Sequence, residues 1–445
     1  MRVGGARQTL RVTEATTQTT TPATAAGGRL GLVQGVALYV AAVLGTGLLV
    51  LPGLTAQVAG PASVLAVVAV IVLVIPLAAT FATLSARYPD PGGVAGYVRR
   101  ALGDTAARAT GYWFYFGTVA GFPVLALLGG EYICAIAGID RAAVPLLGLA
   151  IVVPPFLINL LGVRIAGWVQ FGLTGLLIGI VVFVVTAAFP AIDAARFEPF
   201  LPHGWAGVGT AISLFVWAFS GWEVGTHISG EFRDPRRIIP IATAIALVIT
   251  GVAYLLLQVV TVGVLGAAAG AGPVALLTLA DAVAPGIGPS AVGAVAGIVV
   301  LGVLNAYLAA FGKLGASLAV HGDLPRALAP GAEAGGVPRR ALLVTFAMAL
   351  SYFGLAVLMG GDMQPFILVH TGNMVAIYTA GMIAALVLLP RRTVGWWTAL
   401  AAAVLSVGLL LLAGLSLVPV GVLALAAVAV TAWRRARARR SRPTA

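Results

Sequence analysis

The stretch that decides the fold is residues 32–58, LVQGVALYVAAVLGTGLLVLPGLTAQV, which contains no charged residue. A helix needs about 20 apolar residues to cross the hydrocarbon core of a bilayer, so this stretch is long enough to span it. Gly45-Thr46-Gly47 lies near its middle and Pro52 follows five residues later, a combination that makes poor continuous helix. Freed backbone groups inside a bilayer are tolerated only where protein or a water-filled cavity satisfies them. The stretch therefore predicts a membrane span that is broken halfway across.

The chain as a whole is also strongly apolar. Hydrophobic residues make up 60% of its 445 residues and charged residues only 9%, whereas soluble domains are about 25% charged. The sequence predicts an all-α polytopic membrane protein with about 12 transmembrane helices. The expected spans are 32–58, 62–86, 110–137, 143–162, 165–189, 205–230, 238–265, 290–318, 340–360, 364–389, 394–413 and 416–433.

Basic residues are distributed unevenly among the connections between these spans. With the N-terminus inside, 24 of the 26 Lys and Arg residues fall in cytoplasmic segments, and only Arg141 and Arg196 fall outside. This asymmetry follows the positive-inside rule and predicts a protein of the cytoplasmic membrane with both termini in the cytoplasm. The net charge of +12 is then explained by the basic residues that fix the orientation of the spans in the membrane. The basic segment after Trp433 is interpreted as an anchor at an anionic leaflet, and no nucleic-acid partner is expected.

Three regions are expected along the chain. Residues 1–30 are rich in Thr, Ala and Gly and predict a disordered cytoplasmic tail. Residues 31–433 form the transmembrane domain, and residues 434–445 a basic cytoplasmic tail. No signal peptide is expected, because the first apolar run begins near Gly31 and is too long for one. Cys134 is the only cysteine and the four histidines have no metal-ligand spacing, so no disulfide, metal or cofactor is expected.

The sixth span repeats the arrangement of the first, since Phe219-Ser220-Gly221 interrupts it. Gly-interrupted segments at corresponding positions of two halves indicate a transporter's midplane site. We therefore expect an inverted five-helix repeat with discontinuous helices 1 and 6, its halves being 31–189 and 205–389. Two additional helices, 394–433, follow. The alternative is that glycine, with 57 residues, is simply frequent in membrane helices.

A broken helix offers partial charges without an ionised side chain. The free amides that begin the outer half of span one suit a carboxylate, and the carbonyls that end the first half of span six suit an ammonium group. Two opposite half-dipoles match a zwitterion, which favours an α-amino acid as substrate. The predicted substrate-binding residues at the two breaks are Gly45, Thr46, Gly47, Leu48, Trp217, Ala218, Phe219, Ser220, Gly221 and Trp222. For the aromatic residues, the alternative is packing or contact with lipid.

Ionisable residues within the spans are candidates for proton transfer or gating. Glu223 directly follows the second break, and His227 and Glu231 come at four-residue intervals on the same helical face. This ladder would carry a coupling proton; alternatively, Glu223 hydrogen-bonds the unwound backbone. Glu131, near the outer end of span three, either contacts substrate or reaches the interface.

Other polar side chains stand on otherwise apolar spans. Asn305 in span eight and Asn373 in span ten are included among the predicted substrate-binding residues, and Tyr307, Thr371 and Tyr378 are further polar groups there. Each either lines the path or bonds a neighbouring helix.

Three motifs in order and spacing resemble those of the amino acid–polyamine–organocation (APC) superfamily. Residues 45–53 look like its first-span signature, residues 87–97 like the loop after its second span, and residues 219–223 with 231–240 like its sixth span and following loop. The resemblance covers residues 31 to about 430 and is closest to bacterial exporters of methionine and branched-chain amino acids. It implies alternating access and backbone binding of substrate at the two breaks. Many members carry a lysine midway along span five, and residues 170–180 contain none.

Together these features predict a secondary active transporter of neutral amino acids such as methionine or branched-chain residues, working as a proton-coupled exporter (antiporter). It is expected to be a monomer or weak homo-oligomer in the lipid bilayer. Uptake permease or exchanger activity is the alternative, and a receptor without transport a lesser one, because the loops and tails are too short for an output domain. An enzyme is not expected, since no nucleophile–base pair or metal cluster converges.

Overall fold

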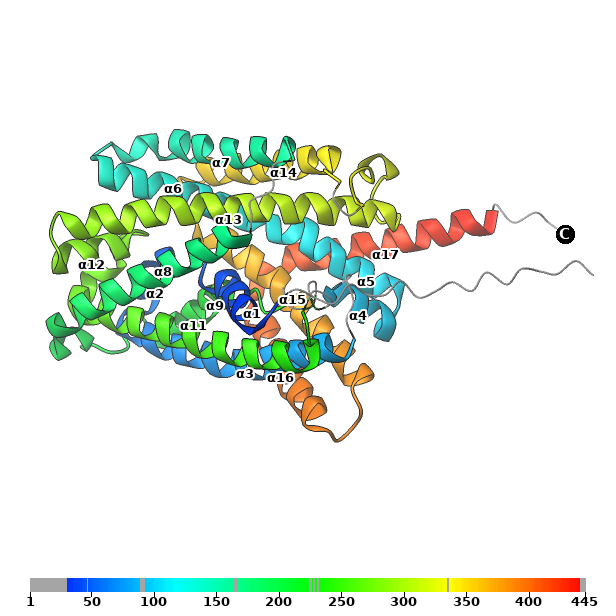
Figure 1. The fold of residues 1–445 in the computed structure, drawn as a ribbon, viewed down its shortest axis with the longest axis horizontal. Helices are drawn as coiled ribbons and strands as arrows, with labels where there is room; N and C mark the ends of the chain where they lie inside the picture. The colour runs from blue at the N-terminus through cyan, green and yellow to red at the C-terminus, as the bar shows by residue number, and fades with distance from the viewer. Residues whose placement is uncertain are drawn as a thin grey trace, which may run out of the picture.

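Helices account for nearly all of the chain in the computed structural model (Figure 1). The structure describes residues 30–45, 47–88, 93–162, 167–223, 226, 229, 232–333 and 336–440, with the backbone alone for 167–170 and 438–440. The predictions for the 1–29 tail, Thr46, His227 and Glu231 lie outside these residues. Across the described residues, the one β-type pairing is an isolated parallel bridge between Leu30 and Phe232. The predicted all-α fold class is confirmed.

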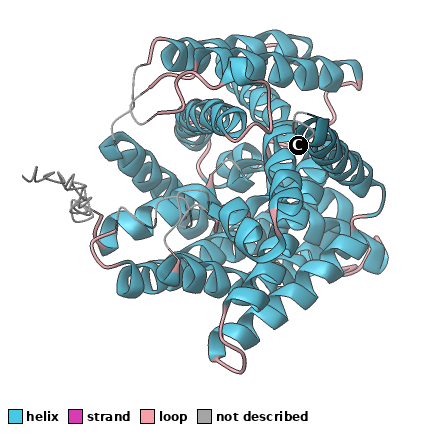
Figure 2. Cartoon of the chain, turned by 90° about the vertical axis from the view of Figure 1, so that its right-hand side faces the viewer, coloured by secondary structure: helices cyan, strands magenta, loops and turns pink. Residues whose placement is uncertain are grey.

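The helices run side by side along one direction, as the end-on view in Figure 2 also shows. Within the described part of the chain, ten helical segments are long and apolar enough to cross a bilayer, and the first of them, Leu32–Arg87, contains three helices. The principal helices are α1 (Leu32–Leu44), α2 (Gly47–Ala59), α3 (Ser63–Arg87), α5 (Asp104–Tyr112), α6 (Phe122–Ala137), α7 (Val144–Leu160), α8 (Gly167–Ala188), α9 (Gly204–Ala218), α11 (Pro235–Leu265), α13 (Ile287–Val320), α14 (Arg339–Leu358), α15 (Gln364–Leu388), α16 (Val394–Leu412) and α17 (Leu417–Arg440).

Two further helices, α4 (Gly93–Leu102) and α12 (Ala275–Val283), lie at opposite ends of the bundle (Figure 1) and were not predicted. In α4, Val94, Tyr97 and Val98 are buried, while Arg100 is exposed. Both helices are short, and a helix on the rim of the bundle is apolar on one face only. A search for long apolar stretches therefore passes over them.

The third span is longer and less regular than predicted. It begins at Asp104 rather than near residue 110, and a π-helical turn, Trp113–Gly117, and a 3₁₀ turn, Thr118–Gly121, separate α5 from α6. A side chain at Gly117 would collide with Asn373 of α15. The close approach of α15 thus requires glycine at this point of the π-helical turn.

An ionic cluster around Asp323 joins helices at the end of the bundle where α17 ends. The Asp323 side chain is 3% exposed, and its Oδ1 accepts hydrogen bonds from Arg108 Nε at 2.7 Å and Arg434 Nη1 at 3.3 Å. The Tyr112 hydroxyl donates to the Asp323 carbonyl at 2.6 Å. These contacts tie α5 and α17 to the loop after α13.

Candidate functional site

The first predicted interruption is present. Helix α1 ends at Leu44, Gly45 has φ +24°, and α2 begins at Gly47. The last carbonyls of a helix have no partner within it. Here the Tyr254 hydroxyl, from α11, lies 3.2 Å from the Val43 carbonyl oxygen and 3.1 Å from that of Leu44. The end of α1 is therefore stabilised from a neighbouring helix.

The second predicted interruption is also present, since α9 ends at Ala218. The Ser220 hydroxyl donates to the Trp217 carbonyl at 2.5 Å, which satisfies one of the last carbonyls of the helix. Gly221 follows with φ +124°, a conformation that L side chains rarely adopt. Most of the expected continuation, residues 222–230, lies outside the described residues.

The two interruptions meet in space. A Cβ atom added to Gly47 would lie 2.7 Å from both the Ala218 Cβ and the Tyr254 hydroxyl oxygen. One added to Gly221 would lie 3.0 Å from the Ala42 carbonyl oxygen. A side chain at Gly47 would collide, and one at Gly221 would crowd a backbone carbonyl in a conformation that L side chains rarely adopt. The amide end of α2 therefore lies beside the carbonyl end of α9.

Aromatic residues surround this junction and are buried rather than exposed to lipid. Trp222 is 1% exposed, and its ring stacks on Tyr39 with centroids 6.0 Å apart. Phe219 is also 1% exposed, and the centroid of its ring lies 4.9 Å from that of Tyr254. Trp217 packs edge-on against His370 at 6.4 Å. Among the described residues the buried indole Nε1 of Trp222 has no hydrogen-bond partner.

Glu223 is the buried carboxylate of the site, with 7% of the residue exposed. Its Oε2 accepts a hydrogen bond from the Tyr378 hydroxyl at 2.6 Å and one from the Gly221 amide at 3.1 Å. The Gly221 amide also lies 3.0 Å from the Tyr378 hydroxyl oxygen. This triangle fixes the unwound backbone to α15, as the structural interpretation of Glu223 expected, and leaves the proton-carrier interpretation open. The rest of the ladder, His227 and Glu231, is outside the described residues.

Three other candidates have partners of their own. Asn159 Nδ2 of α7 donates to Asn305 Oδ1 at 2.8 Å, so Asn305 bonds a neighbouring helix. Asn373 Nδ2 donates to the Val369 carbonyl of its own helix at 2.9 Å. Arg141 Nη2 lies 2.5 Å from Glu131 Oε1, which favours the interface interpretation of that carboxylate.

Sequence reasoning gave no role to Tyr254 or to Gln258, which lie one turn apart on α11. Gln258 is fully buried, and its Nε2 donates to Ser63 Oγ at 2.7 Å while its Oε1 accepts from Thr55 at 3.3 Å. It thereby links α2, α3 and α11. Tyr254 and Gln258 are four residues apart in an apolar span, and residues at that spacing share one helix face. This spacing was the signal in the sequence that could have indicated a polar contact with neighbouring helices.

The fold defines a class, the multi-pass membrane proteins built from a bundle of apolar helices. The fold is similar to that of MhsT in complex with L-phenylalanine, with a TM-score of 0.56 over 87% of this chain and 99% of that one, at 14% sequence identity. The sequence profile of the amino acid permease family matches residues 30–433. This chain belongs to that family, so the resemblance to the APC superfamily is confirmed.

Two relatives illustrate the family. The chain is 30% identical over 377 residues to the uncharacterized amino acid permease YecA of Bacillus subtilis, covering 83% of this chain and 87% of that one. It is 33% identical over 228 residues to the L-methionine/branched-chain amino acid exporter YjeH of Escherichia coli, covering 51% and 54%. The family and the fold are those of membrane transporters rather than enzymes.

Proposed function

We propose that this protein transports a neutral, apolar α-amino acid across the cytoplasmic membrane by alternating access, and that the two interruptions bind it. The observation that carries the proposal is the contact of Gly47 with Ala218. It brings the free amides of α2, which suit a carboxylate, next to the last carbonyls of α9, which suit an ammonium group. A zwitterion satisfies both helix ends at once.

The surroundings of this junction favour an apolar side chain on the substrate. Trp222, Phe219 and Tyr39 supply buried aromatic surface. Glu223 already accepts hydrogen bonds from Tyr378 and Gly221 through Oε2, which partly compensates its charge. The similarity to YjeH, named an L-methionine/branched-chain amino acid exporter, points to the same substrate class and to export.

Glu223 is the proposed carrier of a coupling proton. A carboxylate that is bonded to a hydroxyl and an amide, rather than to a cation, accepts a proton without leaving a partner charge unpaired. Protonation weakens its acceptor strength toward Gly221 and Tyr378. The unwound segment and α15 would then separate more easily, which couples proton binding to the conformational change.

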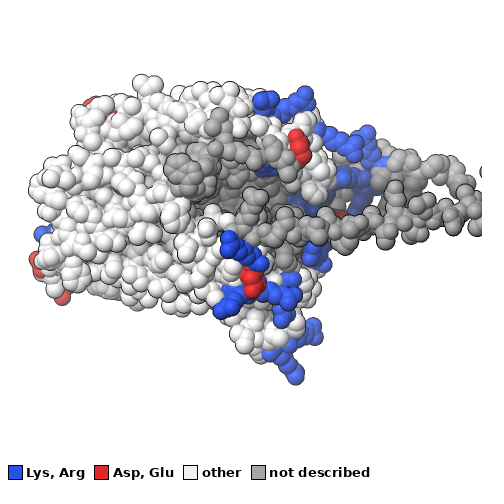
Figure 3. All heavy atoms as spheres, viewed as in Figure 1, with Lys and Arg blue, Asp and Glu red and all other residues white. Residues whose placement is uncertain are grey.

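The proposed topology has twelve spans with both termini inside. The segment Leu32–Arg87 supplies two of them and the shorter apolar helix Gly204–Ala218 begins the sixth. Lys and Arg side chains gather at the end of the bundle where α17 ends (Figure 3), the end proposed as cytoplasmic. Residues 31–189 and 205–389 form the inverted repeats, and 394–433 the two additional helices.

Flux assays in sealed vesicles test this function. Radiolabelled methionine, leucine and isoleucine are offered with imposed proton or sodium gradients, and we expect proton-dependent flux of all three. Gly47→Leu should abolish flux, because its side chain would collide with Ala218. Gly408→Leu is the matched control, since nothing lies within 4 Å of a Cβ there. Binding without translocation would instead identify a receptor and contradict the proposal.

A further inference from the structure

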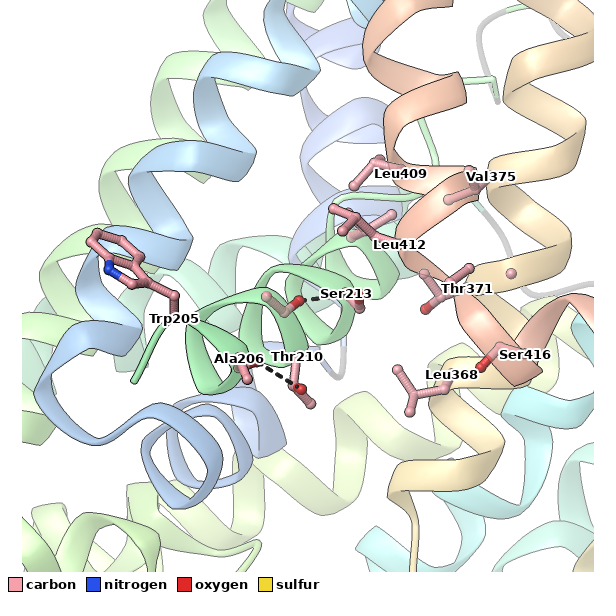
Figure 4. A pocket seen from close by; sticks show the side chains of 14 residues that line it. Trp205, Ala206, Thr210, Ser213, Leu368, Thr371, Val375, Leu409, Leu412 and Ser416 are labelled. Carbon is pink, nitrogen blue, oxygen red and sulfur yellow. Dashed lines mark hydrogen bonds between the residues drawn. The ribbon is translucent and has the colours of Figure 1, made fainter. Parts of the chain in front are cut away.

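Helices α1 and α9, which end at the two interruptions, differ in the free space beside them. Helix α9 borders a cavity of about 300 Å³ that it shares with α15 and α16 (Figure 4). At the end of α1, Ala41 and Gly45 border a cavity of about 10 Å³, which is about the space that one water molecule needs. Because protein interiors are close-packed, α1 moves by separating from its neighbours, and its contacts therefore decide whether it moves.

One face of α1 meets aromatic side chains along its whole length. Three positions at four-residue spacing form this face, and each contacts one aromatic residue from the part of the chain that follows the second interruption. The contacts are Gly35 with Phe232, Tyr39 with Trp222, and the Val43 carbonyl with Tyr254. A Cβ atom added to Gly35 would lie 2.7 Å from Phe232 Cε1 and 3.3 Å from the Ala242 Cβ. The Phe232 ring therefore occupies the place that a side chain at Gly35 would need.

Phe232 is buried although the residues that follow it are exposed. It is 2% exposed, whereas Arg233 and Asp234 are exposed. The backbone fixes this segment as well, because Phe232 forms a parallel bridge with Leu30 and the Arg233 amide donates to the Leu30 carbonyl at 3.1 Å. The segment before α1 is thereby fastened to the segment before α11, at the end of the bundle that is proposed as cytoplasmic.

The position of this contact on α1 gives it leverage. Gly45 has φ +24° and ends the helix, which makes it the pivot for a tilt of α1. Gly35 lies ten residues earlier, about 15 Å along the helix, so a tilt of about 20° would move it by about 5 Å. The same tilt would move Val43 by about 1 Å. The contact of Gly35 with Phe232 is therefore the first to break when α1 tilts.

We propose that Phe232 is a latch that closes the cytoplasmic side of the protein. With its ring at Gly35, α1 lies against α11 and the route from the interruptions to the cytoplasm is shut. Withdrawal of the ring releases α1 and opens that route. Because withdrawal exposes a buried phenyl ring to water, the contact favours the closed state about 10- to 100-fold. The latch rests on the alternating access proposed above, and it names the contact that sets how readily the inner side opens.

Cysteine accessibility tests the latch without measuring transport. Cys134 is the only cysteine of the chain, so Cys134→Ser provides a background without thiols. Ala242→Cys then places one thiol next to Gly35, at a position that is fully buried while the latch is closed. Inside-out and right-side-out membrane vesicles are treated with a membrane-impermeant maleimide, and the rate of labelling is measured in each.

Two variants open the latch in different ways. Phe232→Ala removes the ring and should raise the labelling rate in inside-out vesicles about 10- to 100-fold, with no change in right-side-out vesicles. Phe156→Ala is its control, since this buried ring stacks on Phe346, between α7 and α14. Gly35→Ala should raise the rate severalfold, because its methyl group would collide with Phe232, although alanine favours a helix more than glycine does. Gly408→Ala is the control for this variant, since nothing lies within 4 Å of a Cβ there.

Three results would overturn the proposal. Equal labelling rates in Phe232→Ala and Phe156→Ala would show that Phe232 only packs. A wild-type rate in Gly35→Ala would show that the ring does not hold α1. Faster labelling from both sides of the membrane would show that the variants loosen the whole fold. Because flux is not part of this measurement, failure of the latch leaves the proposed transport function standing, and failure of transport leaves the latch testable.

Discussion

Two buried carboxylates, Asp323 at the end of the bundle and Glu223 at the helix interruptions, have opposite surroundings. Asp323 accepts hydrogen bonds from Arg108 and Arg434, and Arg99 lies 4.0 Å away. Glu223 accepts hydrogen bonds from a tyrosine hydroxyl and a backbone amide. Removing the charge of Asp323 would leave the buried guanidinium group of Arg108 unpaired, whereas removing that of Glu223 leaves only neutral donors. The first carboxylate is therefore suited to holding helices together, and the second to changing its charge during a transport cycle.

The largest expected effect is on stability, at Asp323. Asp323→Asn leaves Arg108 buried without its counter-charge and should lower the free energy of unfolding by about 3–5 kcal/mol. Thermal unfolding in detergent measures the loss. Arg99→Gln is the control, since the Arg99 side chain is 38% exposed and its removal should cost at most about 1 kcal/mol. Equal losses in the two variants would show that the cluster is not held by the buried pair.

At Glu223 the effect should fall on transport. Glu223→Gln keeps the shape of the side chain but cannot exchange a proton, so flux should lose its dependence on pH. It should also fall about 10- to 100-fold, because bonds to a charged acceptor contribute about 1.5–3 kcal/mol. Unfolding should change less than in Asp323→Asn. An unaltered pH profile at normal turnover would reduce Glu223 to a structural role.

Tyr378→Phe sharpens the contrast by removing one donor and keeping the carboxylate. The Gly221 amide still bonds Glu223, so we expect a loss of about 1.5 kcal/mol, equivalent to roughly tenfold lower flux, with the pH dependence shifted rather than lost. Initial rates across a pH series measure both. A pH profile identical to wild type would mean that this hydroxyl does not influence Glu223.

Tyr254→Phe probes the other interruption, where the acceptors are neutral carbonyls. Losing a hydrogen bond to a neutral group costs about 0.5–1.5 kcal/mol, so flux should fall less than in Tyr378→Phe. The pH dependence should match that of the wild type, because no titratable group of the proposed cycle is touched. A shifted profile would contradict the assignment of proton coupling to the second interruption.

The smallest effect is expected at Glu131. Its partner Arg141 has a side chain that is 68% exposed, and ion pairs with an exposed partner contribute about 0–1 kcal/mol. Glu131→Gln should therefore leave flux and its pH dependence unchanged. Flux measured beside that of Glu223→Gln tests this, and a comparable loss would return Glu131 to the candidate site.

The sequence predicted the all-α membrane fold and the ends of helices at Leu44 and Ala218 because these depend on local composition and backbone chemistry. Gly45 and Gly221 mark the breaks through conformations that other residues resist. The partners that satisfy the breaks could not be predicted, since Tyr378 lies 155 residues from Glu223 and Tyr254 lies 210 from Leu44. Asn305 was favoured for polarity alone, and one sequence does not say which helix a polar face meets. That face meets Asn159 of α7.

Competition against radiolabelled L-leucine flux tests the central claim most directly, namely that opposed helix ends at Gly47 and Ala218 bind a zwitterion. The competitors are L-leucine, the amine that lacks its carboxylate, and the acid that lacks its ammonium group. Only the intact amino acid should compete at low concentration, because each analogue leaves one helix end unsatisfied. If either analogue competes as well as L-leucine, the two helix ends do not form the binding site.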